Sequence, residues 1–223
     1  MIVLAIDTAL AACQAAAWSD GRLLALRSEP MDRGHQERLA PMAAEVMAEA
    51  GLAFDRLDRI AVTLGPGSFT GLRVGLAFAK GLALALDRPC VGVGTLEALA
   101  ASAGGDGTRV AVIDARRERA YLQVFRDGAP AMAPDALPLP DAAARLAELH
   151  RGPEAVLVGP GAALLEGVIA EARLDPREWP DAAALAALAA ARPLPAAPPR
   201  PLYLRAPDAR TLEERGAARP AAS

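Results

Sequence analysis

Residues 65–75 read Gly-Pro-Gly-Ser-Phe-Thr-Gly-Leu-Arg-Val-Gly, and this glycine-rich stretch separates two regular segments. The apolar run at residues 60–64 before it is typical of a buried strand, and a helical period follows it as far as about residue 86. We therefore expect a strand, a tight loop and a long helix. Such a loop presents backbone N–H groups that favour an anion. A turn whose glycines only allow positive φ and close packing would have the same sequence, so both interpretations stay open.

The spacing of these residues differs from the common nucleotide-binding and hydrolase motifs. No Gly-Lys-Ser/Thr follows the first glycine, and the glycines do not follow the Gly-x-Gly-x-x-Gly pattern. Ser68 lies outside a Gly-x-Ser-x-Gly elbow, and no histidine near it in the sequence is placed to activate it. A P-loop, a dinucleotide-binding loop and a serine hydrolase are therefore disfavoured.

The N-terminus is expected to form three antiparallel strands. Residues 2–6 are a continuous apolar run, and Asp-Gly at residues 20–21 separates two further apolar runs, which predicts a hairpin. Asp7, followed by Thr8, ends the first strand, where α/β folds often hold a magnesium-bound phosphate. A carboxylate that caps a turn is the alternative. The candidate nucleotide-binding residues are Asp7, Thr8, Gly65, Gly67 and Ser68.

Two helices carry faces that a partner protein would fit. The helix predicted at residues 36–50 has an apolar face with two adaptable methionines, and the helix after the glycine loop has a stripe of small residues spaced by four. Core packing explains either face equally well. The candidate partner-binding residues are Leu39, Met42, Val46, Met47, Gly71, Leu72, Gly75 and Ala79.

A boundary between two lobes is expected at residues 103–107, where three glycines and an aspartate interrupt both periods. We divide the chain into residues 1–103 and residues 104–223, the latter with a proline-rich linker at 192–201 and a C-terminal tail. Strands are expected at residues 91–93, 110–113, 121–125 and 155–158, and helices at residues 95–101, 142–149, 162–172 and 182–191. The pattern favours an α/β class.

Composition excludes several classes of function. The net charge of −3 over 223 residues disfavours a protein that grips nucleic acid alone, although the tail and the arginines at 116, 117 and 119 are locally basic. A solvated turn explains those arginines as well as an anion grip does. Cys13 and Cys90 lie in apolar runs, and His35 and His150 are far apart, so neither a disulfide framework nor a metal site is expected.

No signal peptide or membrane span is expected. The first apolar run reaches a carboxylate after a few residues, and Arg73 and Lys80 interrupt the longest apolar stretch. We therefore expect a cytoplasmic protein with no membrane association.

Five segments together resemble the TsaB (YeaZ) family, over nearly the whole chain. Residues 65–75 are the most specific of them, whereas residues 127–200 are far less diagnostic. The others are Ile-Asp-Thr at 6–8, His-Gln-Glu-Arg-Leu-Ala-Pro at 35–41, Asp-Ala-Arg-Arg at 114–117 and Tyr-Leu-Arg at 203–205. The resemblance implies an actin-like ATPase domain type of fold, with two ribonuclease-H-like lobes and mixed sheets flanked by helices.

The resemblance also implies what the chain does. The family supports the modification of tRNA to N6-threonylcarbamoyladenosine beside the anticodon, as a non-catalytic relative of the catalytic subunit TsaD. In TsaD a His-x-x-x-His metal pair lies where this chain has Thr95 and Leu99, which cannot replace two imidazoles. The implied partners are TsaD through the first two helices, the ATPase TsaE, a second copy when TsaD is missing, and tRNA only through the complex. No cofactor is implied.

Two other classes remain as alternatives. One is an ATP-dependent small-molecule kinase that uses Asp7 and the loop at residues 65–71. The other is a peptidase of the kind that relatives of this fold have been called, with Ser68 as its nucleophile.

Overall fold

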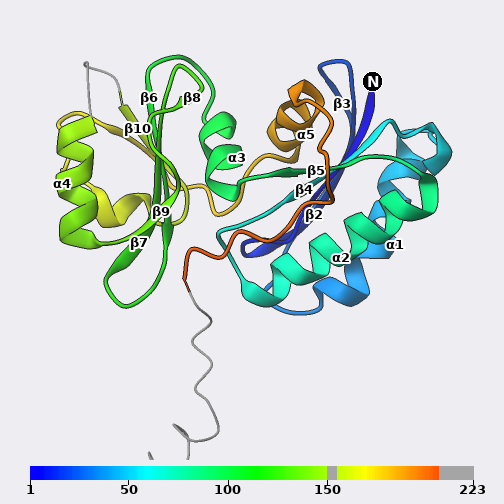
Figure 1. The fold of residues 1–223 in the computed structure, drawn as a ribbon, viewed down its shortest axis with the longest axis horizontal. Coiled ribbons are helices and arrows are strands. Elements are labelled where there is room, and N and C mark those ends of the chain that lie inside the picture. The colour runs from blue at the N-terminus through cyan, green and yellow to red at the C-terminus, as the bar shows by residue number, and fades with distance from the viewer. Residues whose placement is uncertain (150–154, 206–223) are drawn as a thin grey trace, which may run out of the picture.

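The computed structural model describes residues 1–149 and 155–205. The C-terminal tail and His150, both considered above, lie outside these residues. Among the described residues, two β-sheets and their helices build two lobes, which Figure 1 shows side by side.

The first sheet has the strand order β3-β2-β1-β4-β5. Its N-terminal strands β1 (Ile2–Asp7), β2 (Ala12–Ser19) and β3 (Arg22–Pro30) are antiparallel, as the sequence predicts. Asp20 and Gly21 both have positive φ, of 45° and 85°, as a two-residue hairpin turn requires. Strands β4 (Arg59–Thr63) and β5 (Cys90–Val93) then run parallel to β1.

Helices cover both faces of this sheet. On one face, α1 (His35–Glu49) contacts β2 and β3, and α2 (Phe69–Leu86) contacts β4. Between β1 and β4 on the other face lies α5 (Ala182–Ala191), whose Leu185 and Ala186 are fully buried. A short 3₁₀ turn, η1 (Phe54–Arg56), leads into β4.

The second sheet has the order β11-β10-β6-β7-β8, with β9 also paired to β7. Helix α4 (Leu139–Leu149) and the 3₁₀ turn η2 (Ala162–Leu165) pack on the sheet's outer face. Its strands are β6 (Thr108–Asp114), β7 (Arg119–Arg126), β8 (Ala129–Pro130), β9 (Asp135–Pro138), β10 (Ala155–Val158) and β11 (Arg173–Asp175).

Helix α3 (Thr95–Ser102) joins the two lobes. Its Leu96 and Leu99 pack against the inner face of the second sheet, with Ile113 and Phe125, while Ala98 belongs to the core under α5. The layers therefore follow the order α1 and α2, first sheet, α5 and α3, second sheet, α4, as Figure 1 shows from right to left. Helix α3 contributes residues to a core cluster of each lobe, Ala98 to the one under α5 and Leu96 and Leu99 to the one under the second sheet.

Two expectations need correction. Residues 104–223 do not form one lobe, because α5 returns to the first sheet and the amide of Leu202 donates to the Leu64 carbonyl oxygen at 2.8 Å. Residues 162–172 are not one helix. The helical turn η2 ends at Leu165, and Gly167 has a φ of 79°, which no right-handed helix accommodates.

Helix α2 is long and apolar enough to cross a membrane by length and composition alone, although it carries Arg73 and Lys80. One such helix is weak evidence for a span. Its small and apolar residues Gly71, Leu72 and Ala79 are buried against the first sheet. About a third of the residues of α2, 33%, are buried, and Val74, Phe78, Leu82 and Leu86 are partly buried against the same core.

Gly71 and Gly81, two of the glycines of α2, differ in the space available for a side chain. A Cβ atom at Gly71 would lie 2.0 Å from the Thr8 carbonyl oxygen, whereas nothing lies within 4 Å of one at Gly81. We expect Gly71→Ala to lower the free energy of unfolding by about 2–3 kcal/mol through overpacking. Gly81→Ala should leave it unchanged or raise it by up to about 1 kcal/mol. Urea unfolding of both variants tests this, and equal effects would contradict the close packing.

Candidate functional site

A cavity of about 420 Å³ lies between the lobes. The first lobe contributes residues 9–11 and 66–69, the second contributes residues 113–116 and Tyr121, and residues 202–205 close one side. Asp32, Asp114, Arg116 and Arg205 give the lining both charge signs. In a two-lobed fold of this kind, such a cleft is the first place to look for a ligand.

Asp7 does not line this cavity. Its carboxylate is fully buried and accepts hydrogen bonds from the Thr63 hydroxyl at 2.6 Å, the Ala9 amide at 3.0 Å and the Gln14 amide at 3.2 Å. Burial raises the pKa of Asp7, and the hydrogen bond from Thr63 opposes that rise most strongly. The carboxylate therefore links the carboxyl ends of β1 and β4 with β2. This geometry supports the structural interpretation of Asp7.

Thr8 is also engaged within the fold. Its hydroxyl donates to the Gly71 carbonyl oxygen at 2.8 Å, and the Ser68 amide donates to the Ala9 carbonyl oxygen at 2.7 Å. Ser68 caps α2, because its hydroxyl oxygen accepts from the Gly71 amide at 3.2 Å. These contacts occupy donors that an anion at the helix N-terminus would need.

The glycine loop brings the chain after β1 against the start of α2. A Cβ atom at Gly67 would lie 2.2 Å from the Ala9 carbonyl oxygen, so only glycine fits there. A Cβ atom at Gly65 would likewise lie 2.8 Å from the Leu202 carbonyl oxygen. Of the five candidate nucleotide-binding residues, the cavity is lined by two, Gly67 and Ser68. The tight-turn interpretation of the loop fits this arrangement better than an anion cradle does.

The sequence analysis missed Thr63 and Gln14 as partners of Asp7. Thr63 lies 56 residues away in the chain but ends the strand parallel to β1. Because the carboxyl ends of neighbouring parallel strands meet at one sheet edge, a polar residue ending the adjacent strand is the signal that could have found it.

The positions that match the metal pair of TsaD lie in the core between the lobes. Thr95 and Leu99 are both fully buried in α3, and Leu99 packs in the cluster under the second sheet. Within residues 1–149 and 155–205, no group of three or more metal-binding side chains is close enough together to hold an ion.

The two cysteines lie in strands, as predicted. Cys13 in β2 and Cys90 in β5 are buried free thiols, and burial raises the pKa of each to about 11. Both are therefore protonated at neutral pH and are poor nucleophiles.

The eight candidate partner-binding residues point into this chain's own core, where all are buried. The stripe of small residues faces β1 and β4: a Cβ atom at Gly75 would lie 2.4 Å from the Thr8 hydroxyl oxygen and 3.7 Å from Val62. A larger residue at Gly75 would therefore disturb folding itself. These side chains are therefore not exposed, although Leu39 also lines a groove along α1 and α2.

The opposite face of the same helices is exposed. Leu84 is 85% exposed, and the other exposed residues of α2 are Thr70, Arg73, Ala77, Lys80, Gly81 and Ala85. A groove of about 490 Å³ lies along the helices. It is lined by Gln36, Leu39, Phe69, Thr70, Arg73, Val74, Ala77 and Phe78. We call this groove with the exposed residues of α2 the outer helix face.

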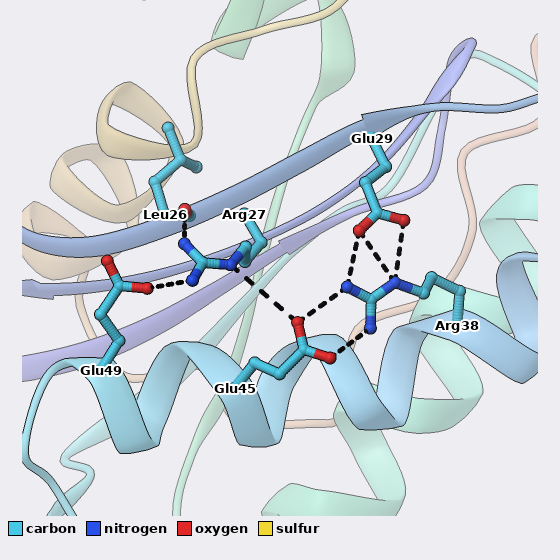
Figure 2. A network of polar contacts seen from close by, with 6 residues as sticks. All are labelled: Leu26, Arg27, Glu29, Arg38, Glu45 and Glu49. Atoms are coloured by element: carbon cyan, nitrogen blue, oxygen red, sulfur yellow. Dashed lines mark hydrogen bonds and ion pairs between the residues drawn. The ribbon is translucent and has the colours of Figure 1, made fainter.

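A network of charges fixes α1 on the edge strand β3 (Figure 2). Arg38 donates to both carboxylate oxygens of Glu29, with its shortest contact at 2.6 Å, and to Glu45 at 2.7 and 2.8 Å. Arg27 reaches Glu49 at 2.5 Å and Glu45 at 4.0 Å. Hydrogen bonds from Arg38 lower the pKa of Glu29 and of Glu45.

Arg38→Gln tests this network. The lowered carboxylate pKa values mean that the network stabilises the fold above the ordinary glutamate pKa and that this contribution is lost as pH falls through the lowered values. We expect the difference in unfolding temperature between wild type and variant to be present at pH 7. It should shrink toward pH 3, and also in 1 M salt, where the Debye length is about 3 Å. Arg33→Gln, at an exposed arginine, is the control, and a pH-independent difference would contradict the assignment.

Asp7→Asn tests the buried carboxylate. Because the folded pKa of Asp7 is raised, its contribution to stability is present in full below the unfolded pKa and declines as pH rises through the folded value. The unfolding free energy of wild type relative to the variant should therefore decrease as pH rises above about 4, by about 1.4 kcal/mol for each unit of pKa shift. Denaturant unfolding from pH 3.5 to 8 measures it. A difference that grows with pH would show a lowered pKa instead.

Comparison with known proteins places the chain in a family. Residues 29–171 match the family model for TsaD, tRNA N6-adenosine threonylcarbamoyltransferase. YeaZ from Pseudomonas aeruginosa superimposes with a TM-score of 0.74 at 33% identity, covering 85% of this chain and 90% of that one. The chain belongs to the TsaB (YeaZ) family. The expected α/β fold of two mixed sheets flanked by helices is likewise confirmed.

Two relatives of this chain differ in the share of their length that aligns with it. Escherichia coli "tRNA threonylcarbamoyladenosine biosynthesis protein TsaB" is 42% identical over 129 residues, which are 56% of this chain and 55% of that protein. The chain thus aligns with about half the length of this relative. A Mycobacterium tuberculosis protein is 37% identical over 213 residues, with 94% of both chains covered. The match to the TsaD model begins at residue 29, so it includes α1 and α2 but not the strands β1 and β2.

Proposed function

We propose that this chain is a non-catalytic subunit in the biosynthesis of N6-threonylcarbamoyladenosine on tRNA, and that it docks on the catalytic subunit TsaD through its outer helix face. The family membership supports the pathway, because relatives are named as tRNA threonylcarbamoyladenosine biosynthesis proteins. The exposed apolar surface of α2 supports the docking role.

The apolar surface is the observation that carries this proposal. Soluble proteins rarely leave contiguous apolar residues exposed, and larger patches of this kind mark interaction sites. The outward side of α2 exposes Leu84, Ala77 and Ala85 together with the polar Thr70, Arg73 and Lys80, and Val74 and Phe78 are half-buried. Small residues there allow a partner helix to approach closely, as helix packing requires.

The non-catalytic role is supported by how the candidate active-site residues are used. Asp7 and Thr8 hold β1, β4 and the start of α2 together, and Ser68 caps a helix. A catalytic acid or nucleophile needs access to a substrate. Thr95 and Leu99 offer no imidazole where TsaD carries its metal pair.

The remaining partners follow from the same role. We propose that the complex also includes the ATPase TsaE, that two copies of this chain pair through the outer helix face when TsaD is absent, and that tRNA is contacted through the complex. The protein would work in the cytoplasm, where tRNA is modified. No cofactor of its own is proposed.

Reconstitution tests the role directly. With this chain's own TsaD and TsaE, substrate tRNA and the threonylcarbamoyl donor, we expect modification that depends on adding this chain. Full activity without it would refute the proposal. Calorimetric titration of the isolated chain with Mg-ATP separates the alternative: strong binding with turnover of an acceptor would indicate an ATP-dependent enzyme.

Leu84→Arg tests the docking surface. Because Leu84 is 85% exposed, the substitution should change the unfolding free energy by no more than about 0.5 kcal/mol. A charge at the centre of an apolar interface should weaken TsaD binding by about 30-fold or more. Leu164→Arg, at a 41% exposed leucine in η2 on the other lobe, is the matched control. Equal affinity for both variants, measured by calorimetry, would place the interface elsewhere.

A further inference from the structure

Residues 202–205, which we call the strap, contact both lobes. On the first lobe, the amide of Leu202 donates to the Leu64 carbonyl oxygen at 2.8 Å, directly before the glycine loop. On the second lobe, the guanidinium of Arg205 donates to the Ala115 carbonyl oxygen at the turn between β6 and β7. The strap also lines the cavity between the lobes. The strap is thus hydrogen-bonded to a backbone oxygen of the first lobe at Leu202 and of the second lobe at Arg205.

Between these two ends, Tyr203 is held on the N-terminal turns of α2. Its ring lies 5.2 Å from the ring of Phe69, and its hydroxyl oxygen accepts from Arg73 Nε at 3.3 Å. The Arg73 guanidinium in turn stands over the Phe69 ring, 3.7 Å from its centre. The three side chains therefore hold one another in a single arrangement.

Two members of this cluster belong to the outer helix face. Phe69 and Arg73 line the groove along α1 and α2, whereas Phe69 also lines the cavity between the lobes. Arg205 lines that cavity and is not among the residues of the groove. A continuous set of contacts thus leads from the groove, through Tyr203, to the second lobe.

We infer that Tyr203 and Arg205 are positioning residues for the docking of the partner: the strap fixes Phe69 and Arg73 in the shape that the partner recognises, and couples docking to the geometry of the two lobes. This inference rests on the proposed docking of TsaD. The physical reason is preorganisation, since side chains already fixed before binding lose less conformational entropy when the partner docks.

The coupling has a direct consequence. A change at Arg205, within the cleft, should weaken docking although Arg205 does not line the groove. By linkage, partner binding must stabilise the strap's contact with the second lobe by the same factor. The amides of the turn at residues 115–119 should accordingly exchange more slowly with deuterium when TsaD is bound to wild type.

The test compares Arg205→Ala and Tyr203→Phe with the control Arg200→Ala, at an exposed arginine just before the strap. We expect each strap variant to weaken TsaD binding about 3- to 10-fold, the range of one net hydrogen bond, with Arg205→Lys restoring part of the loss. Arg200→Ala should stay within about twofold by the same arithmetic. Calorimetry gives the affinities, and thermal unfolding of the free variants identifies any loss that is only structural.

A double-mutant cycle decides between positioning and direct contact. If Arg205 acts through Arg73, then Arg205→Ala should cost much less affinity in an Arg73→Ala background than in wild type. Additive losses, or strap variants that bind TsaD as wild type does, would overturn the inference and leave the proposed function standing. Failure of wild type itself to bind TsaD would refute the proposed function, and the coupling with it.

Discussion

The close approach of the chain after β1 to the first turns of α2 is the constraint on which the rest of the structure depends. Backbone oxygens of Thr8 and Ala9 lie where any side chain at positions 71 and 67 would be. Two hydrogen bonds fill the same space, from the Thr8 hydroxyl to the Gly71 carbonyl oxygen and from the Ser68 amide to the Ala9 carbonyl oxygen. Because α2 is fixed there, the long helix lies flat on the first sheet and its other side faces outward. The most specific segment of the sequence thus serves packing, and the outward surface follows from it.

The same constraint shapes the cleft between the lobes. In a fold of this type, a carboxylate after β1 and a glycine loop after β4 would be a natural pair of phosphate and metal ligands. Here the Asp7 carboxylate accepts hydrogen bonds from Thr63, Ala9 and Gln14. The glycine loop packs against the backbone of Ala9. A cavity remains, but its polar lining comes mainly from Asp32, Asp114 and the arginines of the rim. The polar groups at the carboxyl ends of β1 and β4 therefore serve as structural contacts within the first lobe.

Sequence signals within a few residues predicted most helices and strands, whereas contacts between residues far apart in the chain determine how these elements pack. The Asp-Gly turn at residues 20–21 and the extents of α1, α2 and α5 follow from sequence signals within a few residues. Strands β8, β9 and β11 are two, four and three residues long, too short to show an alternating pattern. The composition of α5 is only alanine and leucine, so it predicts a helix without indicating which sheet it covers. The bond between Asp7 and Thr63 spans 56 residues and has no local signal.

The small-residue face of α2 shows why periodicity alone could not decide between core packing and docking. A helix with one polar side reveals its buried side, because the polar residues must face water. In α2 the inward side is small and apolar, and the outward side is mixed, with Leu84, Ala77 and Ala85 exposed beside Thr70, Arg73 and Lys80. Spacing identified a stripe that allows close packing, and both a sheet and a partner helix could use it. Only the positions of Thr8 and Val62 beside Gly75 decide for the sheet. Packing within the described chain does not account for the exposed Leu84 on the outward side, and the docking proposed above would account for it.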